Sequence, residues 1–418
     1  MLKGIKIRLY LDDEQIVYVN KLLGCSRFIY NNLLSYKIEE YNSNKYDVSF
    51  GELGKKLVKL KSEYEWIRES HSKVLQQSLI NLEKAYHNFF VNHSGFPKFK
   101  SKRDNKQSCR FPADAIGKIN GNRINIITSL KNIHFKCSSS DEKYLNKYQS
   151  LIKSATLSKT KSGIYQFSIL IDRPNKILNK PTNNIIGIDL GIKAFVTASN
   201  GQIFENLKLN RSDKRKLVKL NRQLSKKQIG SNNRNKARIK LAKYNEKLNN
   251  KKENYLHHVA NQLLNENQVI VMEDLNVKGM MKNHKLARSI QELSLFRFKE
   301  ILTYKSVWYG RDIVQIDRFF PSSKLCNCCG YKYQNLSLNE RHWDCPVCGA
   351  VHDRDLNAAI NIEHEGNRIL KIGLSKPELK LVENGSVDEL SRKAMLKSIH
   401  SMKQEDQAAK LINENIKI

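Results

Sequence analysis

Two short apolar runs that each end in an acidic residue constrain the fold of this chain more than any other feature. Residues 185–188 (Ile-Ile-Gly-Ile) end at Asp189, and residues 269–272 (Val-Ile-Val-Met) end at Glu273. Unbroken apolar runs of this length are typical of strands buried on both faces, which predicts a sheet covered by helices. The two carboxylates then lie where each strand emerges, held rigidly by the sheet while their oxygens reach solvent or a metal ion.

A third acid, Asp355, is predicted to open a helix over residues 353–362. Asp355 and Ala359 recur at helical spacing, and the small side chain of Ala359 lets the helix lie close to the sheet. Together Asp189, Glu273 and Asp355 predict a magnesium site, because carboxylate oxygens are hard ligands that suit this ion.

The second and third of these positions each have a competing acid nearby. Asp274 follows Glu273, but strand alternation puts the two side chains on opposite faces, and Glu273 directly ends the apolar run. Asp353 precedes the predicted helix and is either its N-terminal cap or the third acid in place of Asp355. We favour Glu273 and Asp355.

Two cysteine pairs, Cys326-x-x-Cys329 and Cys345-x-x-Cys348, lie between the second and third acids, with fifteen residues between the pairs. This spacing is a strong signal of a zinc site, and a glycine follows each pair, as expected of a knuckle that turns around the ion. The alternative is four reduced cysteines without a metal. A closed four-cysteine site is structural, which leaves hydrolysis to the carboxylates. Cys328 falls outside the register of the pairs.

The charge of the chain favours a nucleic-acid partner. Lysine and arginine total 73 against 41 aspartates and glutamates, a formal net charge of +32. The excess is concentrated, since residues 208–252 hold seventeen basic and two acidic residues, a net +15. Leucines at helical spacing around a break at Gly230-Ser231 predict a basic helical hairpin. We expect it to bind external phosphate rather than to be a merely solvated helix pair.

A second basic segment, residues 95–110 (GFPKFKSKRDNKQSCR), interleaves Phe96 and Phe99 with basic side chains. Such a segment either stacks on bases while it holds phosphates, or is a basic loop whose two aromatic side chains anchor it to the core.

The cysteine usage and the N-terminal residues predict a soluble, cytoplasmic protein. Four of the eight cysteines form the paired clusters and the rest form no pattern of their own, which is typical of a reducing compartment. Residues 1–8 alternate in polarity instead of forming an apolar signal core, and no window approaches the ~18 apolar residues of a membrane span.

The remaining patterns suggest how the chain is organised. A first strand is followed by a helical insertion over residues 12–93, and further strands with a turn at Asn120-Gly121 are expected to join the first strand in one β-domain. Residues 185–204 predict an antiparallel meander. Residues 363–418 hold ten basic and nine acidic side chains, so this tail is expected to lie outside the nucleic-acid path and to be partly disordered.

The order of the predicted elements is that of a ribonuclease-H-like nuclease core: a meander, a helix, a further strand and a late helix. The acids lie on the first strand, the fourth strand and the last helix, as in such a core. Phosphodiester hydrolysis by two metal ions roughly 3.5 to 4 Å apart needs carboxylates that converge from several rigid elements. Asp189 on the central strand is the natural bridging ligand. Gly187 and Gly191 leave room beside it for backbone or substrate.

Five stretches resemble signature motifs of the TnpB family, transposon-encoded RNA-guided DNA endonucleases related to type V CRISPR effectors. They are GFPKFKSKR at 95–103, GIDLGIKAFVTASNG at 187–201, VIVMEDLNVKGM at 269–280, DRFFPSSKLCNCCG at 317–330 and CPVCGAVHDRDLNAAINI at 345–362. The resemblance covers residues 1 to about 362 in the family's order, and Cys328 is additional to the motifs.

The resemblance implies a multidomain α/β fold. The N-terminal half would contain a wedge-like β-barrel domain (1–11 and 110–180) and a helical recognition lobe with the basic loop (12–109). The C-terminal half would contain a RuvC-type, ribonuclease-H-like nuclease domain (181–320 and 352–365), which includes the basic hairpin at 208–265. A zinc ribbon that binds the target (321–351) would be inserted into the nuclease domain, and a tail (366–418) would follow it.

The resemblance also implies an activity. The catalytic acids of the family match Asp189, Glu273 and Asp355, which would hold two Mg²⁺ ions, and its Zn²⁺ ligands match Cys326, Cys329, Cys345 and Cys348. The implied partners are a guide RNA from the transposon end and a double-stranded target DNA, cut next to a short motif, and a monomer is favoured. The alternatives are a guided DNA-binding protein without cleavage and a transposase that acts without a guide. The intact acids favour the nuclease.

Overall fold

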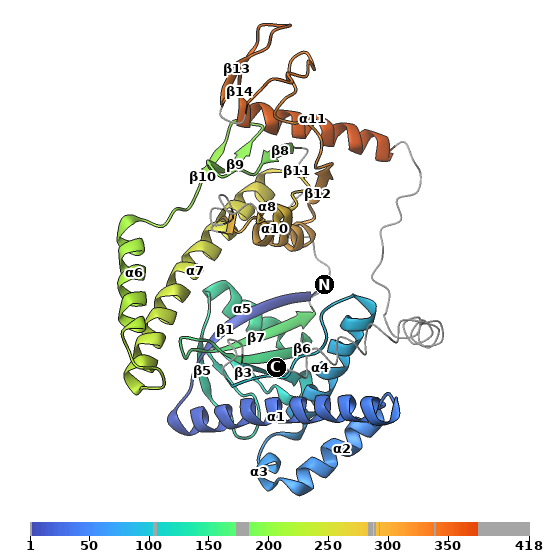
Figure 1. The fold of residues 1–418 in the computed structure, drawn as a ribbon, viewed down its shortest axis with the longest axis vertical. Helices are drawn as coiled ribbons and strands as arrows, with labels where there is room; N and C mark the ends of the chain where they lie inside the picture. Colours follow the sequence, from blue (N-terminus) through green and yellow to red (C-terminus); the bar gives the residue numbers. More distant parts are fainter. Residues whose placement is uncertain are drawn as a thin grey trace.

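The computed structural model describes residues 2–102, 107–172, 184–282, 287, 290, 291, 293–337 and 340–374. The fold is mixed α/β, with a seven-stranded sheet, a five-stranded sheet and a two-stranded hairpin. Figure 1 shows the seven-stranded sheet packed with the N-terminal helices and the five-stranded sheet in a second lobe that carries the hairpin at its far end.

The seven-stranded sheet joins the first strand of the chain to strands that follow the N-terminal helices. Its strands are β1 (Leu2–Tyr10), β2 (Gln107–Pro112), β3 (Ile119–Asn120), β4 (Arg123–Ile124), β5 (Ile133–Lys136), β6 (Ile152–Lys159) and β7 (Tyr165–Asp172). The order is β2-β6-β7-β1-β5-β4-β3, and β1 is antiparallel to both β7 and β5. Every second residue of β1 and β7 is buried in one core, as period-two patterning requires.

The hydrogen bonding of this sheet does not close it into a barrel. Strands β2 and β3 form its two edges, and no pairing between them is found among the described residues. Barrel closure remains an expectation drawn from the family resemblance. The sheet also starts earlier than the domain boundary expected at residue 110, because residues 107–109 of β2 already pair with β6.

Four helices lie between β1 and β2. They are α1 (Asp13–Asn44), α2 (Phe50–Glu63), α3 (Glu65–Arg68) and α4 (Ser72–Val91). Asp12 and Ser49 cap α1 and α2, each in a capping box that satisfies backbone N–H groups of the first turn. Of the two aromatics in the basic loop, Phe96 packs on the helical core, as an anchoring side chain would, whereas Phe99 is exposed. Stacking of Phe99 on bases stays a prediction.

The five-stranded sheet forms the core of the second lobe. Its strands are β8 (Ile185–Asp189), β9 (Ala194–Ala198), β10 (Ile203–Glu205), β11 (Val269–Glu273) and β12 (Asp312–Ile316), in the order β10-β9-β8-β11-β12. Strand β8 is central, parallel to β11 and antiparallel to β9. Alternate residues of β11 pack in two different hydrophobic cores. Ile270 and Met272 face one side of the sheet, and Val269 and Val271 face the other side.

Helices cover both faces of this sheet. The first face packs on α7 (Asn232–Glu266) and α10 (Leu295–Tyr309), and the second on α11 (Arg354–Leu374); a short helix, α8 (Val277–Met280), follows β11. Helix α11 is longer than predicted, because Ile369 and Leu370 continue its apolar face onto the sheet. The expected tail therefore begins inside a helix at residue 366, and residues 375–418 lie outside the described part of the chain.

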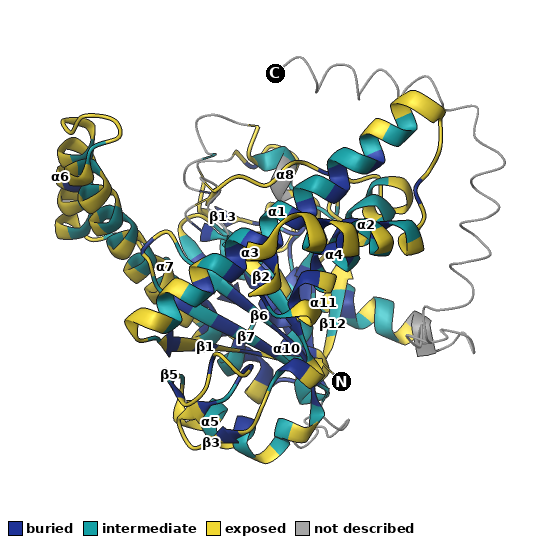
Figure 2. Ribbon diagram, turned by 90° about the horizontal axis from the view of Figure 1, so that it is seen from below, coloured by how far each residue is buried: buried dark blue, intermediate teal, exposed yellow. Residues whose placement is uncertain are grey.

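The basic segment forms the predicted helical hairpin. Helix α6 (Arg211–Ser225) and α7 are joined by a turn in which Gly230 adopts a positive φ of 88° and Ser231 caps α7. Figure 2 shows the hairpin projecting from the body of the molecule with a largely exposed surface.

The two-stranded hairpin, β13 (His342–Asp344) and β14 (Val351–Asp353), lies between β12 and α11 in the chain. One further helix, α5 (Ser139–Tyr148), and two single turns, Ala113–Ala115 and Gln149–Leu151, belong to the seven-stranded part. Across the described ranges, we find no helix with the length and apolarity needed to cross a bilayer.

Candidate active site

The first two acids end neighbouring parallel strands. Ile188 of β8 is paired with Met272 of β11, so the residues that follow them, Asp189 and Glu273, emerge at the same edge of the sheet. This is the arrangement expected from the two apolar runs. It follows from the parallel pairing, which aligns the carboxyl ends of the two strands.

Helix α11 brings the third acid to this edge by lying directly on β8. A Cβ atom added to Gly187 would stand only 2.1 Å from the carbonyl oxygen of Ala359 and 2.6 Å from the backbone nitrogen of Glu363. The absence of a side chain at Gly187 therefore permits the contact between strand and helix. Asp355 lies in the first turn of α11, one turn before Ala359.

The other two carboxylates act electrostatically on Asp189. Burial, together with the charges of Glu273 and Asp355, raises the pKa of Asp189 to about 7, although Arg354 and the backbone N–H of Leu190 act in the opposite direction. Burial also raises the pKa of Glu273, and a hydrogen bond from Ser322 partly offsets the rise. Like charges held together in a half-buried site are the electrostatic condition that a divalent cation relieves.

The third acid is held in an ion pair. Arg341, close to the two-stranded hairpin, places Nη1 3.0 Å from Oδ1 of Asp355. Across the described residues, the only groups of three or more potential ligand atoms that all lie within 4.8 Å of one another are made of cysteine and histidine. The three carboxylates are thus grouped at one edge of the sheet but more widely spaced than a closed single-ion site.

The competing acids are engaged elsewhere. Oδ1 of Asp353 accepts hydrogen bonds from the backbone N–H groups of Asp355 (3.0 Å) and Leu356 (2.9 Å), so Asp353 caps α11. Asp274 forms ion pairs with Lys299 (3.0 Å) and Arg318 (2.7 Å), whose hydrogen bonds lower its pKa.

The four paired cysteines converge as their spacing predicts. Sγ of Cys326 lies 3.6 Å from Sγ of Cys348, and Sγ of Cys329 lies 3.6 Å from Sγ of Cys345. These separations are close to the ~3.8 Å edge of a tetrahedron with Zn–S bonds of ~2.3 Å. The glycine after each pair adopts a positive φ, 76° at residue 330 and 70° at residue 349, and donates its N–H back to the first cysteine of the pair.

The thiol chemistry also fits a zinc ion. Burial of Cys345 disfavours its thiolate, yet the backbone N–H groups of Cys348 and Val347, together with the thiols of Cys329 and Cys348, lower the pKa of Cys345 to about 7. A thiolate supported by N–H donors is the form that binds zinc. The donor set and its spacing therefore suit Zn²⁺.

Several residues at these sites were not predicted from the sequence to take part in them. Nε2 of His352 lies 3.1 Å from Sγ of Cys326, and Cys328, set aside as out of register, forms a second compact group with these two residues. Ser322 and Arg341 contact the acids, but neither belongs to a spacing pattern. Only the folded chain brings them together.

The basic hairpin neutralises little of its own charge. The two acidic side chains within residues 208–252 are both hydrogen-bonded, Asp213 by the hydroxyl of Tyr244 at 2.5 Å and Glu246 by the hydroxyl of Ser162 in the turn between β6 and β7. The second contact ties the hairpin to the seven-stranded sheet. The field of the seventeen basic residues is therefore directed mainly to solvent or to a bound polyanion.

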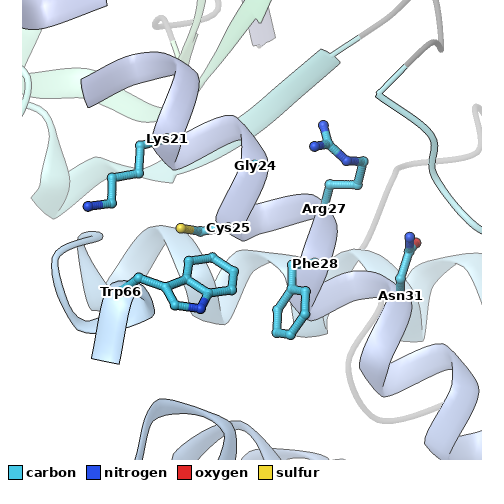
Figure 3. Close-up of a pocket in the computed structure, with 7 residues that line it drawn as sticks. All are labelled: Lys21, Gly24, Cys25, Arg27, Phe28, Asn31 and Trp66. Carbon is cyan, nitrogen blue, oxygen red and sulfur yellow. The ribbon is translucent and has the colours of Figure 1, made fainter. Parts of the chain in front are cut away.

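A pocket of about 410 Å³ lies far along the chain from the acids, in the N-terminal helices (Figure 3). Phe28 and Trp66 form an edge-to-face pair there, with ring centroids 4.9 Å apart, and Lys21 and Arg27 lie among the other lining residues. It is mostly apolar and separate from both candidate metal sites.

Comparison with solved structures defines the class of fold. The chain resembles the protein in "Cryo-EM structure of the Cas12f1-sgRNA-target DNA complex" with a TM-score of 0.54 and 14% sequence identity, over 87% of this chain and 98% of that one. The protein thus shares the overall fold of this Cas12f1 protein. Residues 296–362, which include the four paired cysteines, match the family described as "Cas12f1-like, TNB domain".

Sequence comparison defines the family. A protein of Streptomyces pristinaespiralis named "Putative RNA-guided DNA endonuclease" is 36% identical over 363 residues, 86% of this chain and 88% of its own length. Escherichia coli InsQ, named in the same way, is 28% identical over 389 residues, 89% of this chain and 94% of its own length. The chain belongs to the TnpB family.

Two further family models match other parts of the chain. Residues 168–284 match the family described as "Probable transposase", and residues 1–46 match one described as "Helix-turn-helix domain". In this structure, however, residues 2–44 form strand β1 and the single long helix α1, which has 32 residues.

Proposed function

We propose that this protein is an RNA-guided DNA endonuclease of a transposable element, which hydrolyses DNA phosphodiester bonds at a guide-complementary target beside a short motif. The five-stranded sheet with α11 would be a RuvC-type nuclease core. The grouping of the three acids at one sheet edge carries this proposal, because the charges of Glu273 and Asp355 help to raise the pKa of the buried Asp189 carboxyl to about 7, and such a cluster is unfavourable without a cation. The names of the two extended relatives supply the substrate class.

In this proposal, Asp189, Glu273 and Asp355 hold two Mg²⁺ ions, which when bound activate water and stabilise the charge of the scissile phosphate. Asp189 ends the central strand of the sheet and is affected by the charges of both other acids, so it would be the ligand shared by the ions. The hydrogen bond from Ser322 to Glu273 fixes one carboxylate oxygen and leaves the other for an ion. Asp355 must exchange its ion pair with Arg341 for metal coordination.

The rest of the chain supplies nucleic-acid contacts in this scheme. The basic hairpin binds the phosphates of the guide RNA or its duplex, since its net +15 has few internal partners. The cysteine site holds a structural Zn²⁺, and the ribbon around it contacts the target DNA. The seven-stranded sheet and the helices α1–α4 act as the wedge-like domain and the recognition lobe that resemblance to the family implies.

Neighbouring acids allow a matched test of the catalytic assignment. The complex would be purified with its RNA and mixed with a plasmid that carries the guide-complementary target and a library of adjacent motifs. Glu273→Gln should abolish Mg²⁺-dependent cleavage, with RNA binding unchanged, while Asp274→Asn should retain cleavage because Asp274 is already paired with Lys299 and Arg318. Full cleavage by Glu273→Gln would refute the site.

One alternative has a specific observation in its favour, because the match to "Probable transposase" covers residues 168–284. A transposase without a guide would use the same metal chemistry. An RNA-free preparation that integrates transposon ends would establish this alternative. A guided binder without cleavage would instead retain target binding and give no Mg²⁺-dependent product from wild-type protein.

A further inference from the structure

The loop that enters the zinc ribbon, residues 321–327, contacts the acidic site through the side chain of Ser322. The Ser322 hydroxyl donates a 2.6 Å hydrogen bond to Oε1 of Glu273, and the serine is only 6% exposed. A buried hydroxyl at this distance from a carboxylate restricts the rotation of that carboxylate. Glu273 is thereby held in one orientation at the end of β11.

Helix α11 holds this loop in place through two buried amides. Nδ2 of Asn361 donates to the carbonyl oxygens of Ser322 (2.8 Å) and Leu325 (2.7 Å), and Asn361 is 5% exposed. One turn earlier, Nδ2 of Asn357 donates to Leu325 O at 2.7 Å, and its Oδ1 accepts from Asn327 N at 3.1 Å.

These contacts form a relay from the helix to the second acid. Asn361 fixes the backbone of Ser322, and Ser322 fixes the carboxylate of Glu273. The same helix carries Asp355 in its first turn. One rigid element therefore sets the position of the third acid directly and that of the second acid through two hydrogen bonds.

We infer that Ser322 is a positioning residue for Glu273, and that Asn361 acts through Ser322, so that α11 aligns two of the three acids for cation binding. This inference rests on the proposed function, because it takes Glu273 as a metal ligand. Hydrogen-bond partners of metal ligands typically change metal affinity by ~10–100-fold when removed. Neither residue need touch the ion to have this effect.

The test measures Mn²⁺ binding to the purified protein by electron paramagnetic resonance, with Asp189→Ala defining the signal of the acidic site. Ser322→Ala should weaken Mn²⁺ binding at least tenfold, while its zinc content and Tm stay those of wild type. Ser323→Ala is the matched control, since Ser323 is the adjacent residue of the same type, and it should bind Mn²⁺ as wild type does. Ser322→Thr keeps the hydroxyl donor and should restore binding to within about threefold.

The relay has a second, independent test at Asn361. Asn361→Asp has nearly the same shape but cannot donate to the two carbonyl groups when ionised, so it should weaken Mn²⁺ binding even if Ser322→Ala fails to fold. Wild-type affinity in both Ser322→Ala and Asn361→Asp would overturn the relay, as would a Ser322→Thr protein as weak as Ser322→Ala.

Failure of the proposed function gives a different result from failure of the relay. If wild type and Asp189→Ala bound Mn²⁺ equally, the acidic site itself would be refuted and the relay with it. If wild type bound Mn²⁺ through Asp189 and Ser322→Ala bound it equally well, only the relay would be refuted.

Discussion

Replacing Gly187 by alanine tests the contact between α11 and β8 that brings Asp355 to the sheet edge. The added Cβ would lie 2.1 Å from the carbonyl oxygen of Ala359, 2.6 Å from the nitrogen of Glu363 and 2.9 Å from its Cβ. An ordinary contact at a Cβ begins at 3.4 Å, so helix and strand must separate by about 1.3 Å (3.4 − 2.1) at this point. The two closest neighbours are backbone atoms, which cannot turn aside.

The cost follows from overpacking. An extra methyl in a well-packed core costs typically ~1–3 kcal/mol, and the backbone contact at Gly187 puts Gly187→Ala at the upper end, about 3 kcal/mol. For a folding unit of 150–250 residues, this corresponds to a fall in Tm of roughly 6–12 °C. Because a displacement of about 1 Å between reacting groups costs about 100-fold in rate, we expect single-turnover cleavage to fall about 100-fold.

Differential scanning fluorimetry and cleavage of a guide-matched plasmid measure the two effects. Gly4→Ala is the control, because Gly4 also lies in a strand but has no atom within 4 Å of the added Cβ. It should change Tm by less than about 2 °C. A Gly187→Ala protein with the Tm and cleavage rate of Gly4→Ala would show that α11 does not lie as close to β8 as described here.

Three further predictions concern the cysteines, the central acid and the ion pair. Cys345→Ser should lose its zinc by elemental analysis and make the ribbon sensitive to protease, whereas Cys328→Ser should keep one zinc per chain; equal zinc contents would contradict the four-cysteine assignment. The pKa of Asp189 is about 7 in the folded protein and about 4 in the unfolded chain, so the folded state loses stability as the pH rises from about 4 to 7. In urea unfolding of the metal-free proteins, wild type should therefore lose up to ~4 kcal/mol relative to Asp189→Asn over this pH range. Arg341→Ala should tighten Mn²⁺ binding up to about fivefold, because it frees Asp355 from a partly exposed ion pair, and weaker binding would mean that Arg341 orients this acid instead.

Local patterns predicted the framework of the acidic site. The apolar runs before Asp189 and Glu273 form β8 and β11 with the predicted bounds, because buried parallel strands leave a continuous hydrophobic signal. The turn at Asn120-Gly121 is also observed, with Gly121 at a φ of 56°. Asp353 caps helix α11, which is one of the two roles predicted for it; the other was that of the third acid.

Contacts between residues far apart in the sequence could not be predicted from these local patterns. The edges of the seven-stranded sheet depend on which distant strands pair, so no local signal predicted that β2 and β3 stay unpaired among the described residues. Helix α5 was not predicted, because its ten residues are mostly polar and bury only Leu145. Likewise, His352 reaches Cys326 from β14, and Arg341 reaches Asp355 from beside β13, both contacts that only tertiary structure creates.

The fit of α11 on the sheet has a consequence for how this protein tolerates insertions. Besides Gly187 against Ala359, a Cβ added to Gly366 would lie 2.4 Å from both methyl groups of Val271, so the helix is fixed at two points seven residues apart. One residue inserted between Asp355 and Ala359 would turn the acid by about 100° around the helix axis, away from the sheet edge. An insertion in the loop between the cysteine pairs would lengthen the ribbon without turning Asp355 around the helix axis. Length variation and fused sequences should therefore be accepted in the ribbon and rejected within this stretch of the helix.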